Sequence, residues 1–147
     1  MISRVLTVSI LGLQPTLITV EIDTIQGIPQ LQIIGLPTKA IEEAKERIVA
    51  AFAHIGVEPR RKRTIVNLTP ADLPKTSAGV ELAIAVGLLE QHNFIPPNTD
   101  PSQKIAYIGE LSLDGSILPV KGLLPLALAA QKLGITHLVF LQCRQIC

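Results

Sequence analysis

The stretch from Thr64 to Leu89 constrains the fold of this chain more than any other. It opens with a short β-type run, TIVNL, continues through a polar loop with two prolines, PADLPKTS, and closes with an apolar segment over residues 78–89 in which Glu81 is the one charged residue. A helix that is apolar on every side is a buried helix. A strand, a polar loop and a buried helix in this order are typical of an α/β domain, where the loop leads to the backbone donors of a helix N-terminus. We therefore expect any chemistry of this chain at this loop.

Periodic patterns on both sides of this stretch predict the remaining elements. Alternating and β-branched runs indicate strands, and apolar residues at spacings of three and four indicate helices. The expected strands are residues 2–13, 16–25, 31–34, 64–68, 105–113, 116–120 and 136–141. The expected helices are residues 38–55, 78–89 and 122–133. This order predicts a mixed α/β (α+β) domain, in which about seven strands form a mixed sheet and helices cover it.

Some boundaries rest on single residues. Gln14-Pro15 is expected to interrupt the first two strands, which pair antiparallel, and Asp114-Gly115 is expected to form a hairpin turn. Glu43 and Arg47 are expected to pair on the outer side of the first helix, because residues at i and i+4 are neighbours there. The residues expected on its buried face are Ile41, Ala44, Ile48, Ala51, Phe52 and Ile55.

Charge and cysteine content narrow the functional classes. A net charge of +1 gives the whole molecule no strong positive potential that would attract nucleic acid. Hydrophobic residues make up 48% of the chain and charged residues 17%, which leaves apolar surface for a partner. Cys143 and Cys147 both lie in the last five residues, which disfavours a disulfide framework and suits a reducing cytosol. The sequence shows neither a signal peptide nor a run of membrane-spanning length. These features predict a cytoplasmic protein without membrane contact.

Arg60, Arg61, Lys62 and Arg63 form the one dense basic cluster of the sequence. Consecutive cations of this kind can contact the phosphates of DNA. The alternative is a solvated approach to the strand that begins at Thr64, and no aromatic residue lies nearby in the sequence to stack on bases. Both interpretations stay open here, and these residues are the candidates for nucleic-acid contact.

The sequence holds no motif for ATP or for a metal ion. A Walker-type loop needs glycines before its Lys and Ser or Thr. Here Lys75 precedes Thr76 and Ser77, and no G-x-x-x-x-G-K-[ST] occurs. The histidines are scattered and have no cysteine or carboxylate at ligand spacing. They are His54, His92 and His137. We therefore expect neither a nucleotide nor a metal ion on this chain itself.

A Ser/Lys dyad at Ser77 is the enzyme candidate. The residue lies at the mouth of the buried helix, whose N-terminus could stabilise an oxyanion. A lysine with a lowered pKa would have to reach its hydroxyl, and Lys75 and Lys121 are the candidates. The alternative is that Thr76 or Ser77 is the N-cap of the helix and satisfies its free donors.

Separate segments, in one order, resemble a single protein family. They are IIGLP at residues 33–37, KERI at 45–48, IVNLTPADLPK at 65–75 and IGELSLDGSILPVKGLLPLALAA at 108–130. Over about residues 1–141 the chain resembles the N-terminal domains of the ComM/YifB proteins, the magnesium-chelatase-like AAA+ family. The resemblance implies the ribosomal-protein-S-five domain-2-like fold, which the proteolytic domain of Lon shares.

The resemblance also implies a domain organisation. Residues 1–141 are expected to form the Lon-like N-terminal domain, and residues 142–147 to begin a linker to an AAA+ module. In full-length relatives the AAA+ module follows this domain. It is expected to bind ATP and Mg²⁺ and to form a hexamer. In the best understood members the hexamer drives branch migration of DNA during natural transformation. The chain is accordingly expected to be a fragment or a truncated product, or to work with an AAA+ module in cis or in trans.

The likeness to Lon can be followed residue by residue. Lon proteases carry their nucleophile in a P-S-A-G motif, and Thr76-Ser77-Ala78-Gly79 puts Ser77 at that position. Their G-E-x-x-L-x-G-x-x-x-P segment is matched by residues 109–119. The position of their catalytic lysine falls on Leu124, however, so Ser77 is expected to be a vestigial nucleophile position.

Three functional hypotheses follow. The leading one is a non-catalytic N-terminal accessory domain of a magnesium-chelatase-like AAA+ ATPase, a ComM-type branch-migration helicase, used for assembly and for contact with DNA or neighbouring subunits. The alternative is a Lon-like Ser/Lys peptidase that uses Ser77. The third is an interaction module without nucleic-acid contact.

Overall fold

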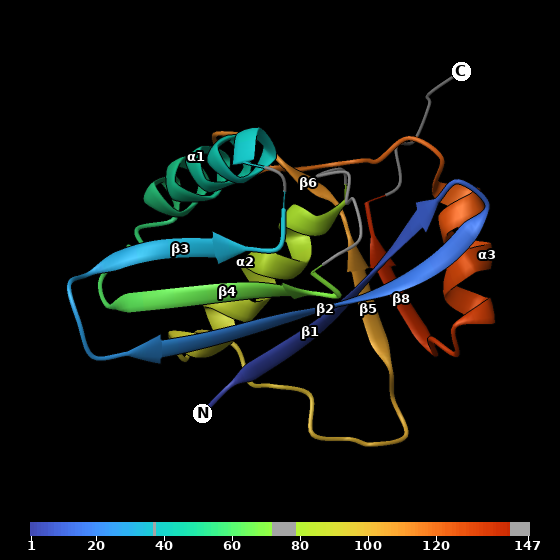
Figure 1. Ribbon diagram of the computed structural model, residues 1–147. Coiled ribbons are helices and arrows are strands. Elements are labelled where there is room, and N and C mark those ends of the chain that lie inside the picture. Colours follow the sequence, from blue (N-terminus) through green and yellow to red (C-terminus); the bar gives the residue numbers. More distant parts are fainter. Residues whose placement is uncertain (37, 72–78, 142–147) are drawn as a thin grey trace.

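The computed structural model of the protein describes residues 1–36, 38–71 and 79–141. Within these ranges the chain forms eight strands and three helices (Figure 1). The strands are β1 (Ser3–Leu11), β2 (Gln14–Ile25), β3 (Gln30–Ile34), β4 (Arg63–Thr69), β5 (Ile105–Ile108), β6 (Glu110–Leu111), β7 (Ile117–Leu118) and β8 (His137–Phe140). The helices are α1 (Thr38–His54), α2 (Val80–Gln91) and α3 (Leu123–Lys132).

Six of the strands form one mixed sheet in the order β3-β4-β2-β1-β5-β8. β2 pairs antiparallel with both β1 and β4, whereas the pairs β3–β4, β1–β5 and β5–β8 are parallel. β6 and β7 form a separate antiparallel hairpin. The predicted mixed α/β class with three helices is confirmed, and the strand count is eight rather than about seven.

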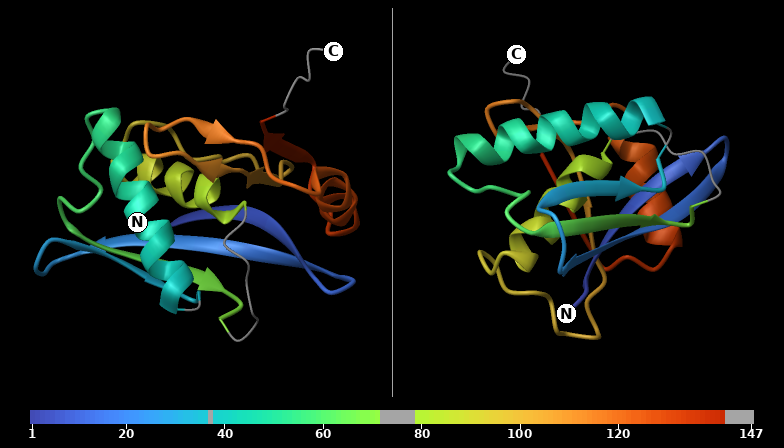
Figure 2. Two further views of the ribbon diagram at one scale, coloured as in Figure 1. Left: turned by 90° about the horizontal axis from the view of Figure 1, so that it is seen from above. Right: turned by 60° about the vertical axis from the view of Figure 1, so that its left-hand side comes forward.

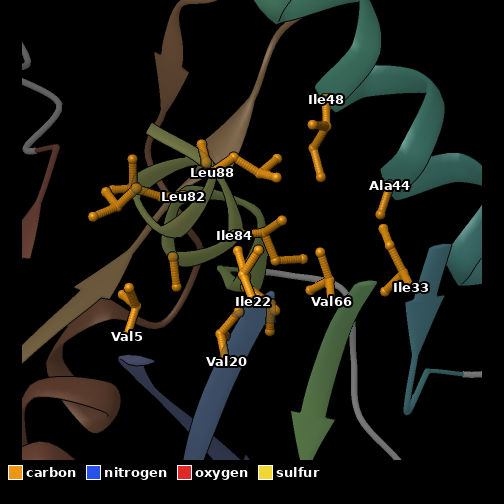
Figure 3. Close-up of a cluster of buried hydrophobic side chains, with 14 of the residues drawn as sticks. Val5, Val20, Ile22, Ile33, Ala44, Ile48, Val66, Leu82, Ile84 and Leu88 are labelled. Atoms are coloured by element: carbon orange, nitrogen blue, oxygen red, sulfur yellow. The ribbon is translucent and has the colours of Figure 1, made fainter. Parts of the chain in front are cut away.

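Helix α2 is the centre of the main core. Residues 80–88 are all buried, as the apolar run predicted. Side chains of the sheet and of α1 converge on it, and Figure 3 shows Ile84 of α2 close to Ile22 of β2. Gly87 lets the helix approach the sheet, because a Cβ atom added there would lie 2.5 Å from the Cδ1 of Ile22.

Helix α1 covers the β3–β4 side of the same face (Figures 1 and 2). Ala44, Ile48, Ala51 and Phe52 are buried there, as predicted. Ile55 was also predicted to be buried, but it is 56% exposed because the helix ends at His54 and Gly56 turns the chain with φ +77°.

Helix α3 packs on the opposite face of the sheet. Successive side chains of a strand point to opposite faces, so Val5 of β1 joins the main core while Val8 joins a second cluster. In that cluster Val8, Ala106 and Ile108 pack with Ala129 and Ala130 of α3. Figure 1 and the left view of Figure 2 place α3 beside the turn of the β1–β2 hairpin, at the opposite end of the molecule from α1.

Two differences from the predicted strands concern the start of β2 and the end of β5. Gln14-Pro15 does not interrupt the strands but begins β2, since the turn is at Gly12-Leu13. Proline is tolerated there because, among the described residues, β4 pairs with β2 only from Thr19 onward.

The expected strand over residues 105–113 is divided at Gly109. Its N–H donates to the carbonyl of Gly79 at 3.1 Å, and its carbonyl accepts the N–H of Leu82 at 3.1 Å. The chain between β5 and β6 therefore bonds to the start of α2 in place of continuing the sheet. Across the described ranges, no helix has both the length and the apolar character needed to span a membrane.

Candidate nucleic-acid interface

The basic cluster lies in the connection between α1 and β4. Val57 and Pro59 are buried and anchor this connection, and β4 begins at Arg63. Arg61 and Lys62 are exposed, whereas Arg63 is half-buried. The segment is therefore held against the core while its charged groups face outward.

Arg60 differs from the other cations because it forms an ion pair with Glu58. Its Nε lies 3.0 Å from the Glu58 Oε1, and its backbone N–H donates to the same oxygen at 2.8 Å. The hydrogen bonds from Arg60 lower the pKa of Glu58 and raise the pKa of Arg60. The positive charge of Arg60 is thus balanced locally, which leaves three cations of the predicted set for an external anion.

Those three cations share a concave surface with the turn between β2 and β3. The pocket has a volume of about 460 Å³. It is lined by Thr24, Ile25, Gln26, Gly27, Pro29, Arg61, Lys62 and Arg63. The sequence identified the basic side of this pocket, whereas the turn was predicted only as a connection between strands.

Arg63 is held over Gly27. A Cβ atom added to Gly27 would lie 2.7 Å from the Arg63 Cδ, so a larger residue would displace the arginine. The Nε of Arg63 is buried and has no hydrogen-bond partner among the described residues. Buried polar groups are rarely left unpaired, and such a group calls for a specific explanation. The positive charge of the Arg63 guanidinium nevertheless lines the pocket.

His92 brings the end of α2 to the same segment. Burial lowers its pKa most, and the positive charges of Lys62 and Arg61 lower it further. Its Nε2 is buried without a partner in the described part of the chain. Sequence reasoning treated His92 as an ordinary histidine, because 29 or more residues separate it from the basic cluster in the printed sequence. An anion near these groups would favour the protonated imidazole.

The described residues cannot test the Ser/Lys dyad predicted at Ser77. Lys75, Thr76 and Ser77 lie outside them. Leu124, in the first turn of α3, is 70% exposed and carries no ionisable group. The N-cap of α2 is Gly79, with φ +85° and no side-chain capping bond, so the prediction of Thr76 or Ser77 as N-cap is wrong.

Possible metal-ligand side chains are dispersed over the described residues. Within residues 1–36, 38–71 and 79–141, no three His, Cys, Asp or Glu side chains gather closely enough to hold a metal ion. The whole sequence also lacks the Walker loop described above.

Comparison with known proteins places these features in a family. Residues 20–142 match the family described as subunit ChlI of Mg-chelatase. The protein YifB of Escherichia coli is 35% identical over 133 residues, which are 90% of this chain and 26% of YifB. The competence protein ComM of Haemophilus influenzae is 35% identical over 122 residues, which are 83% of this chain and 24% of ComM.

A more distant similarity links the chain to a protease. Lon protease 2 of Hydrogenovibrio crunogenus is 36% identical over 89 residues, which are 60% of this chain and 8% of the protease. This match agrees with the Lon-like fold. The chain spans about a quarter of the length of ComM and YifB.

Proposed function

This chain belongs to the family described as subunit ChlI of Mg-chelatase, and from this premise we propose that it is a non-catalytic accessory domain of a magnesium-chelatase-like AAA+ ATPase. The domain contacts DNA through Arg61, Lys62 and Arg63, and ATP hydrolysis takes place on a separate AAA+ module. The similarity to the competence protein ComM supports a role in DNA processing during natural transformation.

The observation that carries the DNA contact is the pocket between the β2–β3 turn and the basic cluster. Phosphate contacts supply most of the sequence-independent affinity of a protein for DNA. Arg61 and Lys62 are exposed at this pocket beside the half-buried Arg63, and all three line it. A phosphate in this pocket would meet the positive charges of Arg61, Lys62 and Arg63.

The remaining parts of the proposal concern the larger assembly. The AAA+ module, in cis or in trans, binds ATP and Mg²⁺ and organises a hexamer in the cytoplasm, and this domain contributes to assembly and to subunit contact. We do not extend the proposal to peptide hydrolysis, because Leu124 occupies the position where Lon proteases carry their lysine.

The test is DNA binding as a function of salt, measured by fluorescence anisotropy on the 147-residue chain. The double variant Arg61→Ala/Lys62→Ala should bind DNA more weakly, and the slope of log affinity against log salt should fall by about 2, since each lost phosphate contact contributes about 0.9. An unchanged slope would contradict the proposal.

Two control variants separate the pocket from general charge effects. Lys121→Ala/Lys132→Ala removes the same net charge next to and within α3, on the opposite face of the sheet, and should change the slope far less. Glu58→Gln/Arg60→Gln removes the local ion pair at constant net charge and should leave DNA affinity nearly unchanged. If the pocket variant and the α3 variant lost equal DNA affinity, DNA would be attracted by the overall positive charge and not by this pocket.

A further inference from the structure

Phe94 is an exposed aromatic residue in a chain with few aromatic residues. The sequence holds three Phe and one Tyr. Phe52 is 2% exposed in the main core and Tyr107 packs against that core, whereas Phe94 is 59% exposed. The core therefore does not require most of the Phe94 surface.

The fold brings Phe94 to the basic cluster. Phe94 follows His92 by two residues, so their Cα atoms lie at most about 7 Å apart. Gln91, three residues before Phe94, accepts a hydrogen bond from the Thr24 hydroxyl at 3.5 Å, and Thr24 lines the pocket that Arg61, Lys62 and Arg63 share. The charges of Lys62 and Arg61 also contribute to the lowered pKa of His92. The fold thus brings the aromatic residue Phe94 into the neighbourhood of the basic cluster, which has no aromatic residue close to it in the sequence.

The backbone around Phe94 is fixed. The N–H of Phe94 donates to the carbonyl of Leu89 at 2.9 Å, and the N–H of Asn93 donates to the carbonyl of Glu90 at 3.1 Å. Asn93 has φ +61°. These bonds form a Schellman motif at the end of α2. A hydrophobic residue often accompanies this motif, but a leucine would serve that contact as well. The motif fixes the backbone that carries the ring before any ligand arrives.

An exposed aromatic ring close to a positively charged groove is an arrangement that can bind single-stranded nucleic acid, because bases stack on the ring while cations contact the backbone. Resting on the proposed DNA contact, we propose that Arg61, Lys62, Arg63 and Phe94 form a binding site for single-stranded DNA, with phosphates on the cations and an unpaired base on Phe94. A duplex offers the same phosphates but keeps its bases stacked inside, so it cannot use Phe94.

The experiment compares a labelled oligothymidylate of about 16 nucleotides, the upper end of the site size of small single-strand-binding domains, with a duplex of the same length. Phe94→Leu keeps the apolar contact of the Schellman motif and removes the aromatic face. It should weaken single-strand binding between about 5- and 150-fold, the range expected for one lost stacking contact. Its salt slope and its duplex affinity should stay at the values of the unchanged protein.

Two further variants act as matched controls. Phe94→Tyr retains an aromatic face and should retain single-strand affinity. Phe140→Leu alters the other exposed phenylalanine, which is 40% exposed on β8 at the edge of the sheet opposite β3 and β4, and should have no effect.

Failure of this inference is distinguishable from failure of the proposed function. If Arg61→Ala/Lys62→Ala lowers binding to both forms of DNA while Phe94→Leu lowers neither, or lowers both equally, the cations contact DNA and the stacking site is refuted. If binding to both forms is insensitive to the cations, the proposed function itself is refuted.

Discussion

Glu81 joins three elements through one buried carboxylate. It is 1% exposed, accepts a hydrogen bond from the Arg47 Nε of α1 at 2.6 Å, and accepts the N–H of Leu111 in β6 at 2.9 Å. This pairing replaces the predicted pair between Glu43 and Arg47. Glu43 is exposed and solvated by water, whereas a buried carboxylate is stable only when it is paired and hydrogen-bonded.

We expect Glu81→Ala to lower the free energy of unfolding by about 3 kcal/mol, because it leaves the N–H of Leu111 buried and Arg47 without its partner. Arg47 is partly exposed, which places the loss at the lower end of the range for broken buried pairs. Urea titration followed by circular dichroism measures the change. Glu43→Ala is the control and should cost less than about 0.5 kcal/mol. If the two variants lost similar free energy of unfolding, the buried pair between Glu81 and Arg47 would contribute no more to stability than an exposed side chain.

At the scale of elements, the distance between α2 and the sheet depends on Gly87. An alanine there would favour the helix by up to about 1 kcal/mol. We nevertheless expect Gly87→Ala to destabilise the protein by about 1–2 kcal/mol, because its Cβ would lie 2.5 Å from the Cδ1 of Ile22. Ile22→Val removes that methyl group and costs about 1 kcal/mol by itself.

The double variant Gly87→Ala/Ile22→Val tests this packing directly. The new methyl group occupies the space that the Cδ1 of Ile22 leaves, so the double variant should be more stable than the sum of the single losses predicts. Thermal unfolding of the four proteins provides the cycle. Strict additivity would mean that Gly87 acts through helix flexibility and not through its contact with Ile22.

The elements that the sequence predicted well are those with a local signal. The apolar run of α2 and the alternation of β2 needed no knowledge of their partners. The division at Gly109 could not be predicted, because it depends on backbone bonds to Gly79 and Leu82, about 30 residues away. The start of β2 at Gln14 is set by the local turn at Gly12-Leu13 and by pairing with Leu11, so the prediction was wrong there because it took the proline as a break.

The candidate site shows the same limit. The cluster from Arg60 to Arg63 is visible in the sequence, and so, in principle, was the neutralising Glu58 two residues before Arg60. The position of Gly27 under Arg63 and the approach of α2 at His92 are not visible, because parallel pairing of β3 with β4 and the packing of α2 create them.

At the scale of the whole molecule, β1 and β5 join two hydrophobic clusters that lie on opposite faces of the sheet. Val5 packs into the main core and Val8 into the cluster beneath α3. In β5, Tyr107 packs against the main core and Ile108 belongs to the second cluster. If β1 or β5 left the sheet, both hydrophobic clusters would lose packed side chains at once. The two clusters should therefore unfold as one cooperative unit.

The single tyrosine makes this prediction measurable, because the chain has no tryptophan and Tyr107 alone reports fluorescence from β5. Urea unfolding followed by tyrosine fluorescence and by far-ultraviolet circular dichroism should give one coincident transition. Ile108→Ala in the second cluster and Ile84→Ala in the main core should each cost about 2–5 kcal/mol and shift both signals together. If Ile108→Ala instead produced an early loss of helical signal while the fluorescence stayed unchanged, α3 would unfold independently. The sheet would then couple the two faces less tightly than their shared strands require.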